Sequence, residues 1–322
     1  MDDKPLIIIN KTAAKACRAW PIVEAKLTEQ KVDFALHQTI RPGDATNATR
    51  AALRDGVTTI AVVGGDGTLS EAAEGFFEFN SQNESPPKAI NSQASLAVLP
   101  SGTGDDFARG LRPKVRLTEW LELFIAHVQH KNHGTTKTVD ILYGSCDNYA
   151  LPFICLNAST MGIGGETAAR VAAQRKLMRT LSGEVRFMAA AIGALVAWRE
   201  RRVRVSVDGS KVIDSSMNLV AIANGLYAGG GMMLSPAARL DDGKLDVITA
   251  CGLTRAGVIR ELPRIHTGGH VANPKINLMQ GTSVQIETFT PEDALLIEVD
   301  GNVRGRTPAE FRVMPAALRF VV

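Results

Sequence analysis

Up to residue 137, short apolar segments alternate with longer segments in which apolar residues recur at helical spacing. The short segments are rich in Ile, Val and Leu, which is typical of buried strands. We expect strands at residues 6–10, 32–38, 58–63 and 96–99, and helices at residues 14–30, 44–54 and 70–79. Strand–helix alternation of this kind predicts a three-layer α/β domain built around a parallel sheet.

From residue 138 onward the apolar segments are short, and few helical segments separate them. We expect strands at residues 139–143, 151–157, 203–207, 217–223, 245–249, 284–287 and 295–299, and helices at residues 187–199 and 255–265. This pattern predicts a mainly antiparallel β-sandwich. Because 322 residues also exceed the usual size of one domain, we expect two domains, at residues 1–137 and 138–310.

Composition narrows the class of protein without indicating an activity. Hydrophobic residues make up 45% of the chain and 29 residues are glycine, which describes an ordinary globular protein with many tight turns. The formal net charge of +3 is small for this length, so the sequence predicts no nucleic-acid partner. The apolar run 187–198 is followed by the densest basic cluster, Arg199, Arg201, Arg202 and Arg204. This pairing fits an anionic membrane surface, or a core helix whose basic end suits its dipole.

Cysteine usage and apolar length predict a cytoplasmic protein. The four cysteines, Cys17, Cys146, Cys155 and Cys251, form no CxxC pair and have no histidine at metal-ligand spacing, so we expect reduced thiols. The charged N-terminus, MDDK, lacks the form of a secretory signal. The longest apolar stretch is about a dozen residues, well short of the roughly 20 that span a bilayer. We therefore expect no transmembrane segment and, at most, peripheral contact with the inner membrane face.

The most informative segment is the junction at residues 61–71, AVVGGDGTLSE, where an apolar strand ends in three glycines around an aspartate. Glycines let backbone N–H groups approach a phosphate closely, and the N-terminus of the following helix adds free donors and a favourable dipole. We expect Thr68 to cap that helix and Asp66 to approach a metal ion that the phosphates also bind. The junction therefore predicts a phosphate-binding site, although it is neither a Walker A sequence nor a GxGxxG fingerprint.

The sequence GGDGT at residues 64–68 resembles the motif shared by diacylglycerol kinases, sphingosine kinases, bacterial lipid kinases and NAD kinases. Residues 100–109, PSGTGDDFAR, are similar to a segment of the lipid-kinase branch that NAD kinases lack, with Asp105 where that branch usually has Asn. The resemblance continues at residues 224–231, 236–238 and 241–246, and covers nearly the whole chain in the expected order. The chain thus resembles the diacylglycerol kinase-like family. This implies a kinase that uses ATP and Mg²⁺ to phosphorylate a hydroxyl of diacylglycerol or a related lipid, presented at a membrane surface.

The resemblance also assigns roles to parts of the chain. It implies that residues 1–137 bind nucleotide, that residues 138–310 bind the lipid, and that the strand-like residues 311–322 return to the first domain. It implies nucleotide contacts from Asn10, Thr39, Gly64, Gly65, Asp66, Gly67, Thr68, Leu69, Ser70 and Thr103. It implies a Mg²⁺ site formed by the Asp242 carboxylate and the backbone carbonyls of Arg239 and Lys244, since a hard cation prefers oxygen ligands. An exposed edge strand in the second domain would allow a homodimer.

One catalytic position departs from the family pattern. The family's motif near the C-terminus reads Asp-Gly-Glu, whereas this chain has Asp300-Gly301-Asn302, and asparagine cannot take the proton of a lipid hydroxyl. Either Asp300 serves as the base, assisted by Asp66 or water, or proton removal matters little because phosphoryl transfer depends mainly on positioning and charge neutralisation. A third alternative is a catalytically weak protein that binds nucleotide and lipid. A fourth is a small-molecule kinase of the NAD kinase type, which residues 102–109 disfavour.

Overall fold

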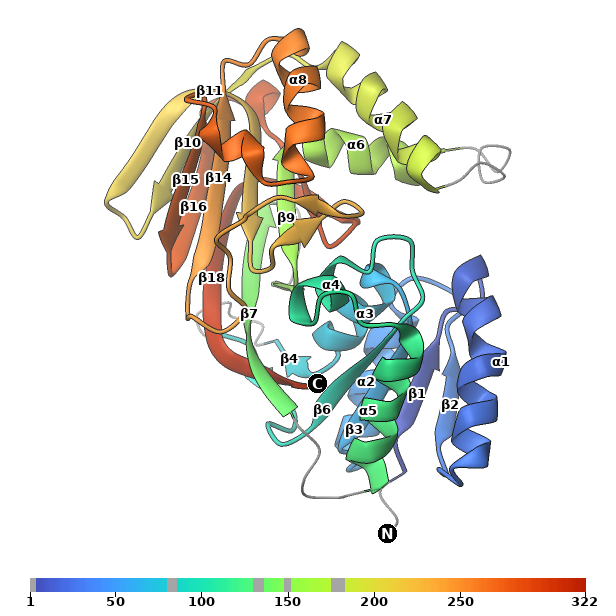
Figure 1. Cartoon of the computed structure of the whole chain (residues 1–322). Coiled ribbons are helices and arrows are strands. Elements are labelled where there is room, and N and C mark those ends of the chain that lie inside the picture. The colour runs from blue at the N-terminus through green and yellow to red at the C-terminus, as the bar shows by residue number, and fades with distance from the viewer. Residues whose placement is uncertain (1–3, 80–85, 130–135, 148–151, 175–182) are drawn as a thin grey trace. The chain divides into compact units, whose positions relative to one another are not determined.

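The computed structural model describes residues 4–79, 86–129, 136–147, 152–174 and 183–322. The chain forms two compact units, both of which are drawn in Figure 1. The first unit consists of Met1–Ile141 and Met314–Val322, and the second of Leu142–Val313. The chain therefore enters the second unit once and returns to the first at its C-terminal end.

The first unit is a parallel sheet with helices on both faces. Its strands are β1 (Leu6–Ile9), β2 (Ala35–Gln38), β3 (Thr59–Gly64), β4 (Phe77–Glu78), β5 (Lys88–Ala89) and β6 (Ser95–Pro100). Its helices are α1 (Ala14–Glu29), α2 (Asp44–Arg54), α3 (Asp66–Glu74), α4 (Asp106–Leu111) and α5 (Leu117–Gln129). β4 and β5 form a separate two-stranded ladder.

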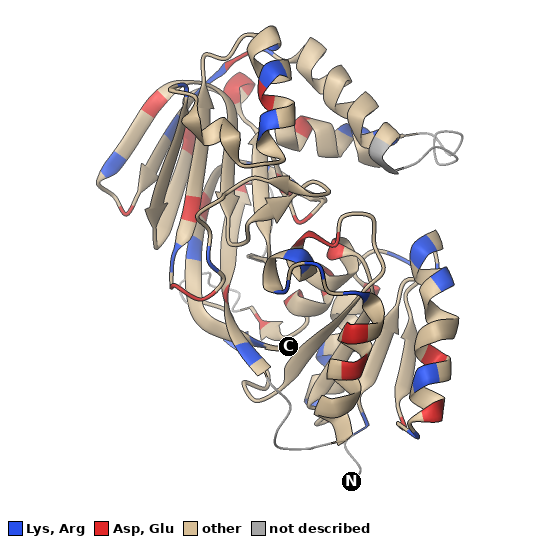
Figure 2. Ribbon diagram, in the orientation of Figure 1, with Lys and Arg blue, Asp and Glu red and all other residues tan. Residues whose placement is uncertain are grey.

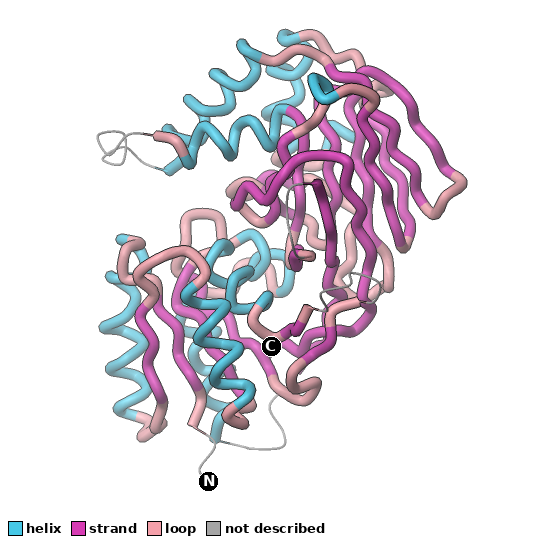
Figure 3. Tube along the Cα trace, turned by 180° about the vertical axis from the view of Figure 1, so that it is seen from behind, coloured by secondary structure: helices cyan, strands magenta, loops and turns pink. Residues whose placement is uncertain are grey.

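The main sheet of this unit has the order β2-β1-β3-β6, and the last residues of β18 (Asn302–Val321) pair with β6. These neighbouring strands are parallel. α1 packs beside α5, and α2 packs beside α3. Since parallel crossovers are right-handed, the connection from β1 to β2 and the connection from β2 back to β3 cover opposite faces. Figure 3 shows the same sheet from behind.

Apolar runs explain why these strands were recognisable. Residues 7–9 and 60–63 are fully buried, because helices cover both faces of the sheet and both sets of alternating side chains must be apolar. The predicted three-layer α/β domain is confirmed. Three details were wrong: β2 begins at Ala35 rather than at residue 32, α3 begins at Asp66 rather than at residue 70, and α4 and α5 were not expected. α5 nevertheless buries Trp120, Leu121, Phe124 and Ile125 at helical spacing.

The second unit consists mainly of antiparallel strands. β7 (Thr136–Asp147) leads into it from the first unit. Its further strands are β8 (Phe153–Cys155), β9 (Ala158–Gly162), β10 (Arg201–Val207), β11 (Lys211–Ala223), β12 (Tyr227–Ala228), β13 (Met232–Met233), β14 (Leu245–Cys251), β15 (Ile276–Gly281), β16 (Ser283–Thr288) and β17 (Leu296–Val299). Its helices are α6 (Ile163–Ala172), α7 (Gly183–Ala197) and α8 (Arg255–Ile265), with short 3₁₀ turns η2 (Gly269–Ala272) and η3 (Pro291–Asp293).

Six strands of this unit form a closed antiparallel circuit. β11 pairs with β10 along its first half and with β9 along its second half. β10 continues through β16 to β18, and β18 returns through β17 to β9. Closure removes free sheet edges and encloses one apolar core, which includes Phe153, Val205, Ile222, Ile286 and Phe311.

β14 and β15 extend the sheet outward from β11, and β15 pairs with β14 on one side as an edge strand. The predicted antiparallel β-rich domain is confirmed. α6, β9 and β15 were not expected, and β8 covers only part of the strand expected at residues 151–157, of which Leu151 lies outside the described residues. Figures 1 and 3 show α6, α7 and α8 gathered at one end of this unit.

Candidate functional site

The carboxyl ends of β1, β2 and β3 lie at one edge of the first unit's sheet. β2 and β3 flank β1 on opposite sides, so this edge contains the switch point at which open α/β sheets bind ligands. Asn10 follows β1, Thr39 follows β2 and Gly64 ends β3. Asn10 Nδ2 donates to Thr68 Oγ1 over 3.4 Å, and the Thr39 N–H donates to the Ile9 carbonyl over 2.9 Å. Residues expected to contact a nucleotide are therefore brought together from three strands.

Helix α3 begins immediately after β3, with Gly65 as its N-cap residue in an extended conformation. The first N–H groups of a helix have no acceptor within it, so the junction offers donors to an anion. The expectation that Thr68 caps this helix was wrong, because Thr68 lies inside the first turn and is buried. Leu69 and Ser70 are buried as well, so their side chains pack within the unit.

Gly65 and Gly102 bring the two glycine-rich loops into backbone contact. A Cβ atom on Gly65 would lie 2.9 Å from the Cα atom of Gly102, a distance that real Cβ atoms do not reach. Nearby, the Ser101 N–H donates to the Gly64 carbonyl over 3.0 Å. Glycine at both positions therefore allows the loop after β6 to cross the loop after β3. Thr103 is exposed in the crossing loop.

Two carboxylates lie where these loops meet. Asp66 Oδ1 accepts a hydrogen bond from the Phe107 N–H over 3.1 Å, and Asp105 Oδ1 accepts one from the Gly102 N–H over 2.8 Å. Burial raises the pKa of Asp105 to about 6; the Gly102 hydrogen bond opposes this shift, and the negative charges of Asp66 and Asp106 add to it. The loop crossing therefore holds more negative charge than it would with Asn at position 105.

Asp300 occupies the tip of a tight hairpin in the second unit. Asp300 and the following Gly301 have φ values of 47° and 89°, so both residues of the turn between β17 and β18 are left-handed. The buried Asp300 carboxylate accepts three backbone hydrogen bonds, from Leu156 over 2.7 Å, from Asn157 over 2.9 Å and from Ala158 over 3.0 Å. These bonds engage both carboxylate oxygens, so the side chain holds the segment between β8 and β9 in place.

The same segment is hydrogen-bonded to the Asn224-Gly225 motif, which follows β11. The Asn224 and Gly225 N–H groups both donate to the Asn157 carbonyl, over 2.8 Å and 3.0 Å. Asn157 Nδ2 in turn donates to the Tyr227 carbonyl over 2.6 Å. Asn157 was not among the residues singled out from the sequence, because it matched no motif. It connects the Asp300 turn to the loop at residues 224–231.

Asn302 and Glu298 flank the Asp300 turn on different faces of the hairpin. Asn302 pairs with Val299, whereas Glu298 pairs with Val303 and with Thr160 of β9. The Thr160 hydroxyl donates to Glu298 Oε2 over 2.6 Å, and the Gly301 N–H donates to Oε1. Burial raises the pKa of Glu298 to about 7, against these two hydrogen bonds, and the Asp300 charge adds to the shift.

Sequence reasoning also missed Glu298, whose only signal was a carboxyl group in a strand two residues before the Asp300 turn. Because successive side chains of a strand alternate between faces, Glu298 does not stand in for the group missing at position 302. It is a titratable group that supports the turn from the opposite face.

The loop at residues 239–244 holds the residues assigned to a metal. Gly243 has a φ of 69°, and the Lys244 N–H donates to Asp242 Oδ1 over 3.1 Å. The exposed Arg239 guanidinium pairs with Asp241 at 3.6 Å rather than with Asp242. No cluster of three His, Cys, Asp or Glu side chains able to hold a metal occurs among the described residues. A cation here would use the Asp242 carboxylate and backbone carbonyls, and such an oxygen set fits Mg²⁺ or Ca²⁺.

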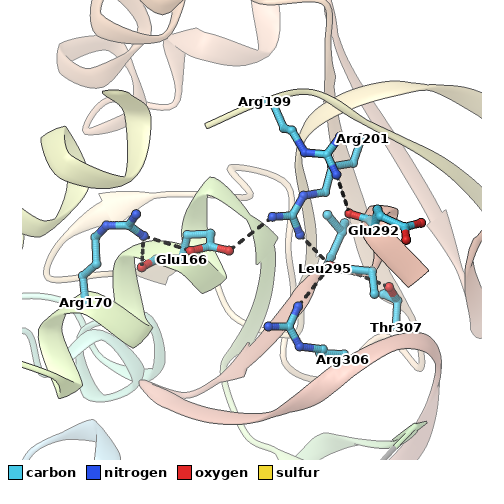
Figure 4. Close-up of polar contacts among 9 residues, drawn as sticks. Glu166, Arg170, Arg199, Arg201, Glu292, Leu295, Arg306 and Thr307 are labelled. Carbon is cyan, nitrogen blue, oxygen red and sulfur yellow. Dashed lines mark hydrogen bonds and ion pairs between the residues drawn. The ribbon is translucent and has the colours of Figure 1, made fainter. Parts of the chain in front are cut away.

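A second polar cluster lies where α6, β10 and β18 meet (Figure 4). Arg170 and Arg201 approach the Glu166 carboxylate from either side, at 2.9 Å and 3.4 Å. Arg201 and Arg306 both donate to the Ala294 carbonyl, over 2.5 Å and 3.4 Å. Two arginines thus share the Glu166 carboxylate, and Arg201 also joins Arg306 at the Ala294 carbonyl.

The predicted site residues divide between the two units. Asn10, Thr39, residues 64–70 and Thr103 belong to the first unit, and they surround the carboxyl ends of its strands. Arg239, Asp242, Lys244, Asp300 and Asn302 belong to the second unit. None of the helices that the structure describes is long and apolar enough to cross a membrane.

Two family models match the chain. The model of the diacylglycerol kinase catalytic domain matches residues 4–142, and the model of the YegS C-terminal NAD kinase beta sandwich-like domain matches residues 160–322. A diacylglycerol kinase from Mycobacterium tuberculosis is 26% identical over 276 residues, which cover 86% of this chain and 80% of the relative. A diacylglycerol kinase from Staphylococcus carnosus is 26% identical over 315 residues, which cover 97% of this chain and 92% of the relative.

The fold is also similar to solved structures. A crystal structure of a diacylglycerol kinase from Bacillus anthracis superposes with a TM-score of 0.65 at 20% identity, and the match covers 99% of this chain and 96% of the other. A crystal structure of a proposed diacylglycerol kinase from the same organism gives a TM-score of 0.70 at 21% identity. At this identity, the likeness concerns the fold.

Proposed function

Since this chain belongs to the diacylglycerol kinase-like family, we propose that it transfers the γ-phosphate of ATP to a hydroxyl group of diacylglycerol or a related lipid, with Mg²⁺ as the metal ion. The main structural support for this proposal is the contact between the two glycine-rich loops at the switch point of the first unit's sheet. The relatives named above carry a diacylglycerol kinase name, which favours a lipid acceptor over the small-molecule acceptor of an NAD kinase.

The first unit holds the nucleotide in this proposal. Backbone N–H groups at Gly65, Asp66 and Gly67 face the phosphates at the start of α3, where the helix dipole also favours negative charge. Asn10, Thr39 and Thr103 supply polar groups around the same edge. Asp66 positions the second loop through Phe107 and directs negative charge toward the metal that accompanies the phosphates.

The second unit supplies the acceptor side. Asp242 and the carbonyls of Arg239 and Lys244 hold a Mg²⁺ ion, which when bound supplies positive charge that offsets nearby anionic groups. Asp300 acts as a positioning residue rather than as the base in this proposal, because its two oxygens accept three backbone N–H groups. The lipid hydroxyl oxygen then bonds to the γ-phosphorus while the bond from that phosphorus to ADP breaks and ADP leaves. The hydroxyl proton passes to water or to the transferred phosphate, consistent with a reaction dominated by charge neutralisation.

A second candidate function follows from Asn302. Since its amide replaces the family's carboxylate, the chain would bind nucleotide and lipid while turning over slowly, because a missing general base costs roughly 10² to 10⁴ in rate.

The four cysteines are free thiols, which supports a cytoplasmic location with peripheral access to the inner membrane face. Pairing of two copies through the edge strand β15 would give a homodimer.

The test is Mg²⁺-dependent transfer of labelled γ-phosphate from ATP to a panel of lipids in mixed micelles. A labelled lipid from the native chain supports the proposal, and its absence at every Mg²⁺ concentration contradicts it. Nucleotide binding without any labelled product, together with product from Asn302→Glu, supports the weak-catalyst alternative.

A further inference from the structure

Four large apolar side chains of α7 are exposed to solvent. Val185, Met188, Ile192 and Val196 are between 48% and 65% exposed. Their spacing of three, four and four residues places them on one side of the helix. Exposed apolar residues scattered singly are normal, but a continuous row along one helix marks an interaction surface.

From residue 187 to residue 197 no polar side chain interrupts this row, whereas Glu184 and Arg186 stand on either side of Val185 in the sequence. Residues 187–197 read FMAAAIGALVA, and the exposed positions between the large side chains are Ala189, Gly193 and Ala197. The opposite side of α7 buries Ala190, Ala194 and Leu195 against the second unit. In Figure 2 most of α7 lacks charge. A helix that is apolar on both sides is normally covered on both sides.

Arginines flank the row at both of its ends. Arg186 donates to the Gln174 side-chain oxygen over 2.8 Å, and Arg199 donates to the Glu292 carbonyl over 2.8 Å. Arg255 of α8 donates to backbone carbonyls at the end of α7. All of these acceptors are neutral, so the hydrogen bonds leave the positive charges in place. Glu184 and Glu200 stand near Arg186 and Arg199 in the sequence, and the three arginines outnumber them. A surface that combines apolar side chains with arginines is complementary to anionic lipid headgroups over acyl chains.

We propose that the row formed by Val185, Met188, Ile192 and Val196, which we term the α7 face, docks into the interface of an anionic lipid bilayer. This inference rests on the proposed function, since a kinase whose acceptor is a lipid must reach that lipid in a membrane. The 15 residues of α7 span only about 22 Å, shorter than the roughly 30 Å hydrocarbon core. The helix therefore lies in the plane of the interface, with its apolar side down and the arginines at headgroup level.

A second copy of the chain fits this surface less well. A symmetric pair of α7 faces would bring the ends of the two helices together. Since arginines outnumber glutamates at these ends, the excess of like charge opposes association. A bilayer that contains anionic headgroups removes this repulsion and covers the whole row at once. An anionic bilayer is therefore the partner that fits the α7 face.

The test is flotation of the protein with vesicles in the absence of nucleotide. We expect binding to vesicles of 70% phosphatidylcholine and 30% phosphatidylglycerol, and at least about tenfold weaker binding for Ile192→Glu and for Val196→Glu, since each change places a charge in the apolar interface. Val212→Glu, at an equally exposed valine of β11, is the matched control and keeps native binding. Unchanged thermal midpoints for all three variants show that folding is intact.

Three results overturn the docking proposal. They are native protein that does not float with these vesicles, Ile192→Glu and Val196→Glu variants that float as well as the native protein, and variants that change only the oligomeric state in sedimentation. The last result would make the α7 face a contact between copies.

A second readout separates this proposal from the proposed kinase activity. We expect Ile192→Glu to phosphorylate dispersed dioctanoylglycerol at the native rate, but to lose at least about tenfold in rate on long-chain diacylglycerol in the same vesicles. Vesicle binding through the α7 face without any phosphorylation would refute the kinase and leave docking intact. Equal rates of Ile192→Glu and native protein on vesicles would refute docking and leave the kinase intact.

Discussion

The carboxylate of Asp66 accepts a hydrogen bond from the backbone N–H of Phe107, with 3.1 Å between Oδ1 and the nitrogen. Asp66 is the first residue of α3, and Phe107 lies in α4, after the second glycine-rich loop. One side chain therefore joins the two loops that cross at Gly65 and Gly102. Substitutions of Asp66 can distinguish the effect of its charge from the effect of its hydrogen bond.

Asp66→Asn keeps an acceptor oxygen for the Phe107 N–H and removes the negative charge. We expect this variant to retain native stability and to lose at least about 100-fold in phosphoryl transfer, because the charge directed toward the metal is gone. Asp66→Ala loses about 1–3 kcal/mol of stability in addition, since a buried N–H loses its acceptor. Urea unfolding and initial rates measure the two effects, with the exposed Asp55→Asn as control. A fully active Asp66→Asn would leave Asp66 with a structural role alone.

Asp105→Asn should stabilise the protein above pH 6. The pKa of Asp105 is raised by burial to about 6, so its favourable contribution is complete below its ordinary value of 3.8 and is lost as the pH rises through about 6. The amide oxygen of asparagine still accepts from the Gly102 N–H without carrying charge. We expect a gain of at most about 3 kcal/mol at pH 8 and little change at pH 4.

Thermal unfolding at pH 4, 6 and 8 measures this dependence on the charge at position 105. A gain of the same size at all three pH values would show that the charge is not the cause. We also expect Asp105→Asn to bind ATP more tightly, since one negative charge is removed beside the phosphate-binding loop. Isothermal titration of the nucleotide at pH 8 checks this second outcome.

Asp300→Asn should unfold the second unit more easily. An amide offers one acceptor oxygen and one NH₂ group, so at least one of the three backbone N–H donors would face a donor instead. We expect a loss of about 2–4 kcal/mol, measured by urea unfolding. Asp208→Asn is the matched control, because Asp208 and Gly209 form the same left-handed turn at an exposed hairpin. Its hydrogen bonds from Thr282 and Ser283 all reach Oδ1, so one amide oxygen can keep them. Native stability with lost activity would instead favour Asp300 as the base.

Glu298 should make stability fall as the pH rises. Its pKa is raised by burial to about 7, so its favourable contribution is complete below its ordinary value of 4.5 and is lost through about pH 7. Glu298→Gln removes this titration and should flatten the pH dependence between 5 and 8 by up to about 3 kcal/mol. Glu287→Gln, at an exposed carboxyl of β16, is the control. Parallel stability curves for Glu298→Gln and native protein would contradict the shifted pKa.

The structural elements predicted most accurately from the sequence are those that local residue patterns alone determine. Fully apolar strands and three glycines before a helix have few alternative structures, so the sheet of the first unit and the junction at residues 64–68 were recognisable. The start of α3 was predicted a few residues too late. Gly65 is the N-cap residue, so Thr68, which was expected to cap the helix, lies in its first turn.

Interactions between distant segments were not predictable from local patterns. The hydrogen bonds between the Asp300 carboxylate and the backbone at residues 156–158 join positions more than 140 residues apart. Burial of Glu298 depends on β9, a strand that the apolar pattern did not indicate. An Asp-Gly pair reads equally as a surface hairpin or as a catalytic motif, and only the tertiary partners of its carboxylate distinguish the two.

The most direct test of the account is transfer of labelled γ-phosphate from ATP to diacylglycerol in mixed micelles, with native protein, Asp66→Asn and Asn302→Glu side by side. We predict Mg²⁺-dependent labelled lipid from the native protein, loss of at least about 100-fold in Asp66→Asn, and a faster rate in Asn302→Glu. Native protein that binds ATP and yields no labelled lipid, while Asn302→Glu yields it readily, would contradict the account and make the chain a nucleotide-binding protein that has lost its chemistry.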